Sequence, residues 1–201
     1  MSWSMFFSEA DSITHDFAPP SDDNPITGVR SKDIFIVPEN DVTLAAETNV
    51  FAVSVEYRLT PEHMIPACYD DSWAAMKWVS QHANGEQGTE PRLKTHADFS
   101  RVFLSGDSAG ANIAHNMMMR ASMDEDKLGD GLRLVGMALI QPFIGNHEPD
   151  RIWSYCCPEN PKSYDPRFNP AVHPNLLSKL VCFKVLICTG GATEDGHTMR
   201  P

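Results

Sequence analysis

Residues 102–121 read VFLSGDSAGANIAHNMMMRA, and this stretch decides the fold. An apolar run at 101–105 predicts a short buried strand, whereas the residues from Ala109 to Ala121 place apolar side chains at helical spacing. Between the two segments lies a Gly-x-Ser-x-Gly pentad centred on Ser108. The pattern predicts a sharp turn from a strand into a helix, with Ser108 at the corner.

A serine at such a corner is suited to nucleophilic chemistry. Gly106, Asp107 and Gly110 complete the turn, and the two glycines leave space where side chains would collide with it. The turn aims the Ser108 hydroxyl into the crevice at the carboxyl ends of the strands. There the N–H of Ala109 and the positive end of the helix can stabilise an oxyanion. A phosphate-binding loop would need a downstream Lys-Ser/Thr pair or a third glycine, and neither is present, so the pentad favours a nucleophile elbow.

Composition is that of one ordinary soluble globular domain, with 42% hydrophobic and 21% charged residues in a chain of 201. The formal net charge is −11 and there is no Lys/Arg cluster, so neither nucleic acid nor an anionic membrane is an expected partner. The chain shows neither a secretory signal nor an apolar run long enough for a transmembrane helix. Its five cysteines form no Cys-x-x-Cys pair, which favours reduced thiols in the cytoplasm over a disulfide framework or a zinc site.

The rest of the chain alternates strand-like and helix-like segments. Residues 8–32 are rich in Asp, Ser and Pro and lack periodicity, so 1–32 are predicted to form an N-terminal arm, which leaves 33–201 as the partial domain. A helix is predicted over 66–83, and the Asp70-Asp71 pair that opens it favours the positive end of the helix dipole. Further strands are predicted at 33–39, 49–57, 132–143 and 182–190. This alternation indicates an α/β fold, with a parallel sheet covered by helices on both faces.

Four segments together resemble one family. They are SVEYRLTPEH (54–63), YDDSWAAMKWV (69–79), DFSRVFLSGDSAGANIAHNMMMRA (98–121) and YDPRFNPA (164–171). In this order and spacing they resemble the plant carboxylesterases, which are α/β-hydrolases of the hormone-sensitive-lipase type and include the gibberellin receptors. The resemblance implies an α/β-hydrolase-type, mostly parallel sheet. It also implies hydrolysis of small carboxylic esters by a Ser-Asp-His triad, without metal or cofactor, with Ser108 as the nucleophile.

Two parts of the family pattern differ in this chain. The family carries a His-Gly-Gly-Gly segment whose N–H groups form most of the oxyanion hole, and no His-Gly-Gly occurs among the 201 residues. The family's acid follows the strand that corresponds to 182–188 here, and Asp195 falls near that position. His197 is too near Asp195 in sequence to contact it and also reach Ser108. We therefore expect an incomplete α/β-hydrolase domain, with early strands and the C-terminal part missing.

No other histidine is assigned as the catalytic base. His115 follows Ser108 on the predicted helix by about 10 Å along its axis, so it is expected to point away and to pack. His63 is expected to have a structural role in its loop. The remaining candidates are placed in loops (His147 and His173) or on the surface (His15, His82 and His96).

Three functions remain open from the sequence. The first is an ester hydrolase with Ser108 as nucleophile. The second is a non-catalytic module that binds a small ligand or a partner, as the gibberellin receptors do without a complete triad. The third is a non-functional truncated splice product, whose unpaired sheet edge would be prone to aggregation. The acyl and alcohol groups of a substrate and the oligomeric state are not assigned.

Overall fold

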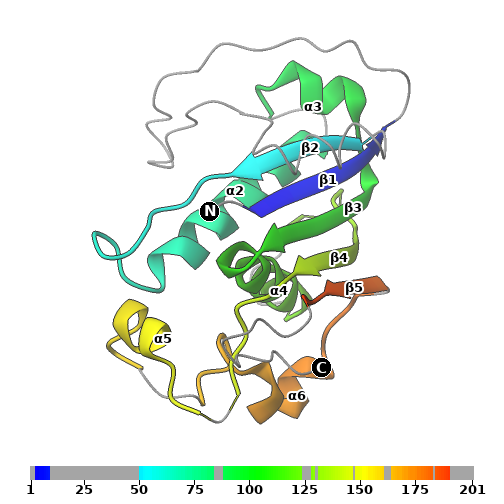
Figure 1. Ribbon diagram of the computed structural model, residues 1–201. Coiled ribbons are helices and arrows are strands. Elements are labelled where there is room, and N and C mark those ends of the chain that lie inside the picture. The colour runs from blue at the N-terminus through cyan, green and yellow to red at the C-terminus, as the bar shows by residue number, and fades with distance from the viewer. Residues whose placement is uncertain are drawn as a thin grey trace.

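The computed structural model describes residues 3–9, 50–83, 88–123, 128–129, 131–146, 148–160, 164–182 and 184–190 (Figure 1). Its sheet consists of β1 (Trp3–Glu9), β2 (Val50–Val55), β3 (Ala97–Asp107), β4 (Leu134–Ile140) and β5 (Lys184–Cys188). The helices are α2 (Ala67–Ala83), α3 (Pro91–His96), α4 (Ala109–Ser122), α5 (Arg151–Cys156) and α6 (Pro174–Leu177), with a 3₁₀ turn, η1 (Pro170–Val172), before α6. In this part of the chain, no helix has both the length and the apolar character needed to cross a bilayer.

The strand order is β2-β1-β3-β4-β5. β3, β4 and β5 run parallel, whereas β1 lies antiparallel between β2 and β3, so the prediction of a mostly parallel sheet is confirmed. β1 differs from the prediction, because residues 3–9 belong to the middle of the sheet and not to an arm. The predicted strand at 33–39 and the boundary between arm and domain lie outside the described residues.

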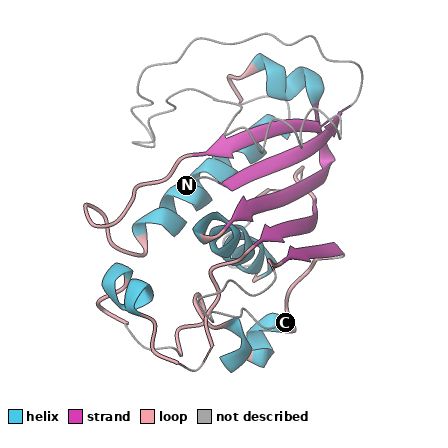
Figure 2. Ribbon diagram, viewed as in Figure 1, coloured by secondary structure: helices cyan, strands magenta, loops and turns pink. Residues whose placement is uncertain are grey.

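Both long helices, α2 and α4, pack on the same face of the sheet (Figure 2). The sequence predicted helices on both faces, and the described residues place their two long helices on one. The helical face predicted for 66–83 is buried, with Trp73, Met76 and Val79 each at most 3% exposed. The sheet and helix residues of this core include Val53, Val55, Val102, Leu104, Met137, Leu139, Ile113, Met117 and Met118.

Two features lie outside this core. β5 forms one end of the sheet, and its apolar side chains Val185, Leu186 and Ile187 are about half exposed. A second, small cluster forms beyond the carboxyl ends of the strands, where the rings of Trp153 and Phe168 stack with their centroids 5.0 Å apart. This cluster anchors the segment around 164–169 near the elbow.

Candidate active site

Ser108 sits between the last residue of β3 and the first residue of α4. Its backbone has φ 54° and ψ −114°, a region that residues with a side chain adopt only under strain. The strand-to-helix corner expected from the pentad is therefore present at this residue. Strain of this kind persists only where the surrounding structure holds the backbone in place.

Gly106 makes the corner possible. A Cβ atom at this position would lie 2.3 Å from the carbonyl carbon and 2.4 Å from the carbonyl oxygen of Gly110. The end of β3 and the first turn of α4 thus touch backbone to backbone. This close approach explains the glycine at position 106.

Three backbone hydrogen bonds fix the Ser108 peptide groups. Its N–H donates to the carbonyl of Ile140 at 2.9 Å, at the end of the neighbouring strand β4. Its carbonyl accepts from the N–H of Phe143 at 3.0 Å and from the N–H of Asn112 at 3.1 Å. The corner is therefore tied to the segment that leaves β4 as well as to its own helix.

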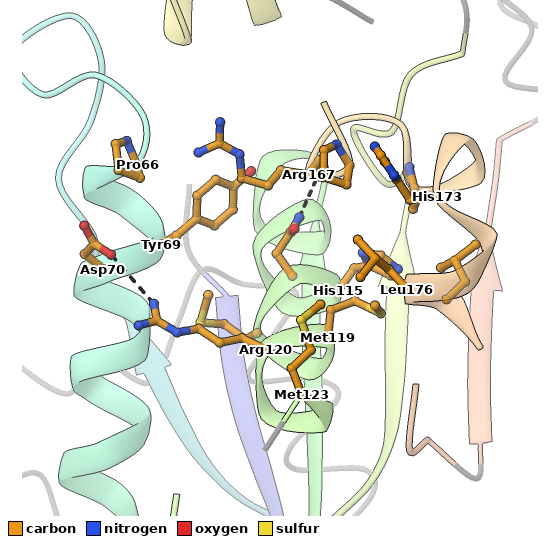
Figure 3. A pocket seen from close by; sticks show the side chains of 15 residues that line it. Pro66, Tyr69, Asp70, His115, Met119, Arg120, Met123, Arg167, His173 and Leu176 are labelled. Atoms are coloured by element: carbon orange, nitrogen blue, oxygen red, sulfur yellow. Dashed lines mark hydrogen bonds and ion pairs between the residues drawn. The ribbon is translucent and has the colours of Figure 1, made fainter. Parts of the chain in front are cut away.

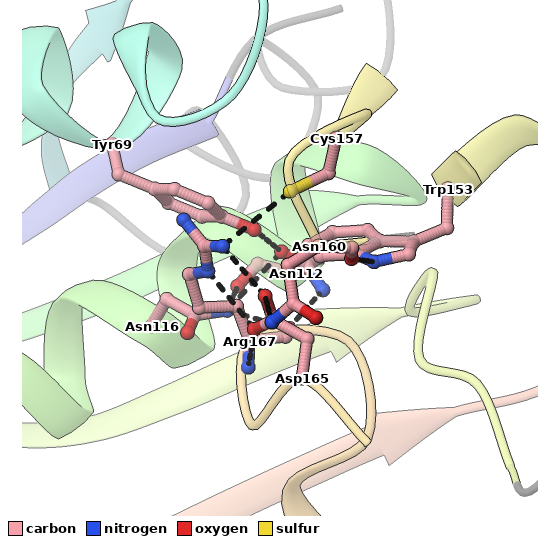
Figure 4. Close-up of polar contacts among 8 residues, drawn as sticks. All are labelled: Tyr69, Asn112, Asn116, Trp153, Cys157, Asn160, Asp165 and Arg167. Atoms are coloured by element: carbon pink, nitrogen blue, oxygen red, sulfur yellow. Dashed lines mark hydrogen bonds and ion pairs between the residues drawn. The ribbon is translucent and has the colours of Figure 1, made fainter. Parts of the chain in front are cut away.

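Asn112 connects the elbow to its surroundings (Figure 4). Its side chain is 3% exposed and its Nδ2 donates to the carbonyls of Phe143 and Arg167, both at 2.8 Å. Its Oδ1 accepts from the Tyr69 hydroxyl at 2.7 Å and from Asn116 Nδ2 at 3.1 Å. One side chain thus joins α2, α4, the segment after β4 and the segment at 164–169.

An ion pair between a buried carboxylate and a half-buried guanidinium stabilises that last segment. Asp165 is 1% exposed and accepts from Arg167 Nε at 2.9 Å and Nη2 at 2.5 Å, and from Asn160 Nδ2 at 2.9 Å. Burial raises the pKa of the Asp165 carboxyl, but the hydrogen bonds from Arg167 outweigh it, so the pKa lies below its ordinary value. The Arg167 guanidinium lies over the Tyr69 and Trp153 rings, 5.8 Å from each centroid.

The two carboxylates in the first turns of α2, Asp70 and Asp71, pair with arginines from other segments in addition to interacting with the helix dipole. Asp71 accepts from Arg58 Nε at 2.9 Å and from Arg58 Nη2 at 2.7 Å, and it also accepts from the Arg58 backbone N–H. Asp70 lies 3.7 Å from Arg120 on α4. The sequence pattern indicated only the dipole interaction and neither of these two pairs.

The described histidines are placed as follows. The expectation that His82 lies on the surface is wrong, because this residue is buried. Its Nδ1 lies 2.9 Å from the Trp78 carbonyl, and its Nε2 accepts from the Glu90 N–H at 3.0 Å, which holds the loop before α3. His115 is buried on α4, as expected for a packed residue. His63 and His173 are exposed, and His96, at the end of α3, is half-buried. Within the described residues no histidine hydrogen-bonds to the Ser108 hydroxyl, whereas His15, His147, His197 and Asp195 lie outside them.

Sequence reasoning did not assign a role to Tyr69, Asn112, Asp165 or Arg167. All four stand in the segments that carried the family resemblance, so their positions were visible but their mutual contacts were not. The contacts join residues up to 98 positions apart, from Tyr69 to Arg167, and only the folded arrangement reveals them.

Comparison with known proteins supports the same fold. A family model described as the α/β hydrolase fold matches residues 40–193. A solved structure from Lactobacillus plantarum superposes with a TM-score of 0.51 at 11% sequence identity, over 96% of this chain and 84% of that one. At this identity the likeness concerns the fold alone.

The curated relatives are plant proteins. The chain is 40% identical over 170 residues to a 2-hydroxyisoflavanone dehydratase of Glycine max, which covers 75% of this chain and 52% of that protein. It is 33% identical to the Glycyrrhiza echinata protein of the same name, over 89% of this chain and 72% of that one. It is 34% identical to "Probable carboxylesterase 13" of Arabidopsis thaliana, over 84% of this chain and 71% of that protein. The chain thus spans about half of the first relative and under three quarters of the others. It belongs to the α/β-hydrolase fold family and, within it, to the plant carboxylesterase-like members.

Proposed function

We propose that this chain is a carboxylic ester hydrolase in which Ser108 is the nucleophile. The observation that carries the proposal is the strained backbone of Ser108 at the corner between β3 and α4, with Gly106 packed against Gly110. Such a corner exposes a serine hydroxyl beyond the carboxyl end of a strand, next to the N–H groups that begin a helix. A small carboxylic ester is the substrate class that suits this arrangement.

The proposed reaction proceeds by acyl transfer. The Ser108 oxygen attacks the ester carbonyl carbon while its proton passes to a base, and the carbonyl oxygen becomes an oxyanion. The Ala109 N–H, at the start of the 14-residue helix α4, donates a hydrogen bond to that oxyanion. The positive end of the helix dipole also stabilises the negative charge of the oxyanion. The alcohol then leaves with a proton, and water releases the acid from Ser108.

The acid is proposed from the sequence alone. Asp195 is the proposed acid, and no histidine is assigned as base. Variants Asp195→Asn and His197→Ala, and alanine variants of His63 and His173, are therefore compared in one labelling assay. The variant with the slowest labelling identifies the group that activates Ser108.

The test uses the purified 201-residue chain and a fluorophosphonate probe. Labelling at Ser108, mapped by mass spectrometry and lost in Ser108→Ala, supports the proposal. Ser100→Ala changes an exposed serine on the same strand and serves as the matched control. A chain that is folded by circular dichroism but unlabelled at Ser108 rejects the hydrolase.

In that event a non-catalytic ligand-binding module is the better description, and it predicts a ligand-dependent rise in melting temperature without turnover. An unfolded chain would instead support the truncated-product hypothesis. Hydrolysis of short p-nitrophenyl esters measures turnover directly. Adding a 2-hydroxyisoflavanone, the compound in the names of two relatives, tests whether dehydration replaces hydrolysis in this chain.

For the compartment we propose the cytoplasm, on the basis of five free cysteines. Two of the tulip relatives are named as chloroplastic and one as amyloplastic, so plastids are the alternative. A fluorescent protein fused to the carboxyl end of the chain distinguishes these compartments in plant cells.

A further inference from the structure

A pocket of about 270 Å³ opens between α2, α4 and the segment 166–177 (Figure 3). On α4 its lining begins at His115, which is about 10 Å along the helix axis from Ser108. The pocket is therefore separate from the proposed nucleophile. Any ligand that it holds would occupy a second site.

The pocket walls are largely apolar. Met119 comes from α4 and Met123 follows its last residue, and Leu176 and Leu177 come from α6 on the opposite side. Methionine side chains adapt to ligands of different shape because they are unbranched and flexible. Since an apolar cavity of about 150 Å³ accepts benzene, this volume has room for one substituted ring or a short chain.

The charged groups at the pocket are already paired. Arg120 lies 3.7 Å from Asp70 and 4.6 Å from the centroid of the Trp73 ring. Arg167 is held by Asp165 through two of its nitrogens. An anionic ligand would have to compete with these two carboxylates, so the pocket favours a neutral ligand.

His115 supplies the polar contact. It is 6% exposed, it lines the pocket, and its Nδ1 has no hydrogen-bond partner among the described residues. Burial lowers the pKa of His115, which keeps the imidazole neutral at pH 7. A hydroxyl group fits such a ring in either tautomer, because it can donate to a bare nitrogen or accept from an N–H. Nδ1 is itself buried, so the ring must turn to present this nitrogen to a ligand, and that turn breaks no hydrogen bond at Nδ1.

We propose that this pocket binds a small neutral apolar molecule with one hydroxyl group, such as a phenol, with the hydroxyl on His115 and the ring between Met119, Met123 and Leu176. The proposal goes beyond ester hydrolysis at Ser108 and does not depend on it. Binding is therefore measured directly and not through activity.

The first experiment locates the site in the full chain. Methionine methyl groups are labelled with ¹³C, assigned by single Met→Leu variants, and followed by NMR as phenol is added. The methyl signals of Met119 and Met123 are expected to shift, while those of Met5 on β1 and Met137 on β4 stay in place. Shifts at Met5 or Met137 without shifts in the pocket would overturn the proposal.

The second experiment tests the role of the hydroxyl. Phenol is compared with toluene, which lacks it, in the wild-type chain and in His115→Leu. We expect the variant to weaken phenol binding about tenfold, the ratio that one hydrogen bond supplies, and to leave toluene binding unchanged. Equal effects on both compounds, or tighter binding of benzoate than of phenol, would contradict the assignment.

A third variant, Leu176→Trp, fills the pocket from α6 without touching the core under the sheet. It is expected to abolish the binding of phenol and of toluene alike. Circular dichroism of both variants establishes that they fold. Should His115→Leu not fold, the methyl shifts in the wild-type chain and the loss of binding in Leu176→Trp still decide the matter, because unchanged binding in the latter would reject this pocket.

Discussion

The Tyr69 hydroxyl donates a hydrogen bond of 2.7 Å to Oδ1 of Asn112, and both side chains are buried. The bond joins the start of α2 to the first turns of α4. Asn112 Nδ2 in turn donates to the Phe143 carbonyl, and the Phe143 N–H donates to the Ser108 carbonyl. The corner at Ser108 is thus supported from α2 through two intermediate residues.

This chain of contacts predicts a measurable coupling between Tyr69 and Asn112. Tyr69→Phe should destabilise the fold by about 1–2 kcal/mol, because it removes one buried hydrogen bond and leaves the Asn116 contact to Oδ1. Asn112→Ala should have a larger effect, about 3 kcal/mol, because the Phe143 carbonyl and the Tyr69 hydroxyl lose their partner, while the Arg167 carbonyl keeps only Asn116 Nδ2 at 3.0 Å.

A double-mutant cycle by urea unfolding measures the coupling, which should exceed about 0.5 kcal/mol. Tyr155→Phe is the matched control, since Tyr155 is 59% exposed, and it should change stability little. Strictly additive effects at Tyr69 and Asn112 would show that the hydrogen bond contributes nothing.

Gly106→Ala should be among the most destabilising single changes in the chain. Its Cβ would lie 2.3 Å from the backbone of Gly110, and neither backbone can move without opening the corner. We expect a loss of about 3 kcal/mol or more in the free energy of unfolding. In Gly190→Ala the nearest atom is the end of the Gln141 side chain at 3.1 Å, which can move aside. Comparable losses for the two variants would contradict the close backbone contact at the elbow.

Ser108→Gly should produce a more stable protein than Ser108→Ala. Glycine adopts the backbone conformation of residue 108 without strain, whereas an alanine at this position remains strained. After allowance for the greater freedom of glycine in the unfolded chain, the difference should be about 1 kcal/mol. Both variants lack the hydroxyl, so both should be unlabelled by the fluorophosphonate. If Ser108→Gly is the less stable of the two, the corner is not strained.

The Asp165–Arg167 pair predicts a loss of stability in acid. Because the pKa of Asp165 in the folded chain lies below its ordinary value, its contribution is present above about pH 4 and is lost as the pH falls through the folded-state pKa. Asp165→Asn removes the charge and should cost about 2 kcal/mol near neutral pH, since Arg167 is half-buried.

The difference between wild type and Asp165→Asn should therefore stay constant from pH 6 to about 4 and shrink as the pH falls further, to about 3. Urea unfolding at several pH values measures it. Asp107→Asn serves as the control, because it also removes one negative charge but from an exposed side chain. It measures how much of the change in stability comes from the lower net charge alone. A difference that stays constant down to about pH 3 would mean that Asp165 is not stabilised by Arg167 in the folded chain.

Much of the sheet could be predicted from sequence because each parallel strand is recognisable from its own few residues. β3, β4 and β5 are short apolar runs between polar segments, and the amphipathic helices α2 and α4 show a clear period. The elbow was equally local, since two glycines and a serine within five residues define it.

The contacts between distant segments could not be predicted. Nothing in the residues around Asp71 indicates Arg58 as its partner, and nothing around Asn112 indicates Arg167. β1 was missed for a different reason. Its sequence WSMFFSE alternates only weakly, and its place between β2 and β3 depends on pairing with strands that come much later in the chain.

The position of β1 has a practical consequence. Since β1 is antiparallel to β3, its first residue, Trp3, pairs with Gly106, and the chain enters the sheet beside the elbow (Figure 1). An affinity tag or fusion partner placed ahead of Trp3 would therefore emerge beside the elbow that carries the proposed nucleophile, Ser108. Probes of Ser108 reactivity are best made with tags at the opposite terminus, so that steric shielding by the tag is not mistaken for an inert serine.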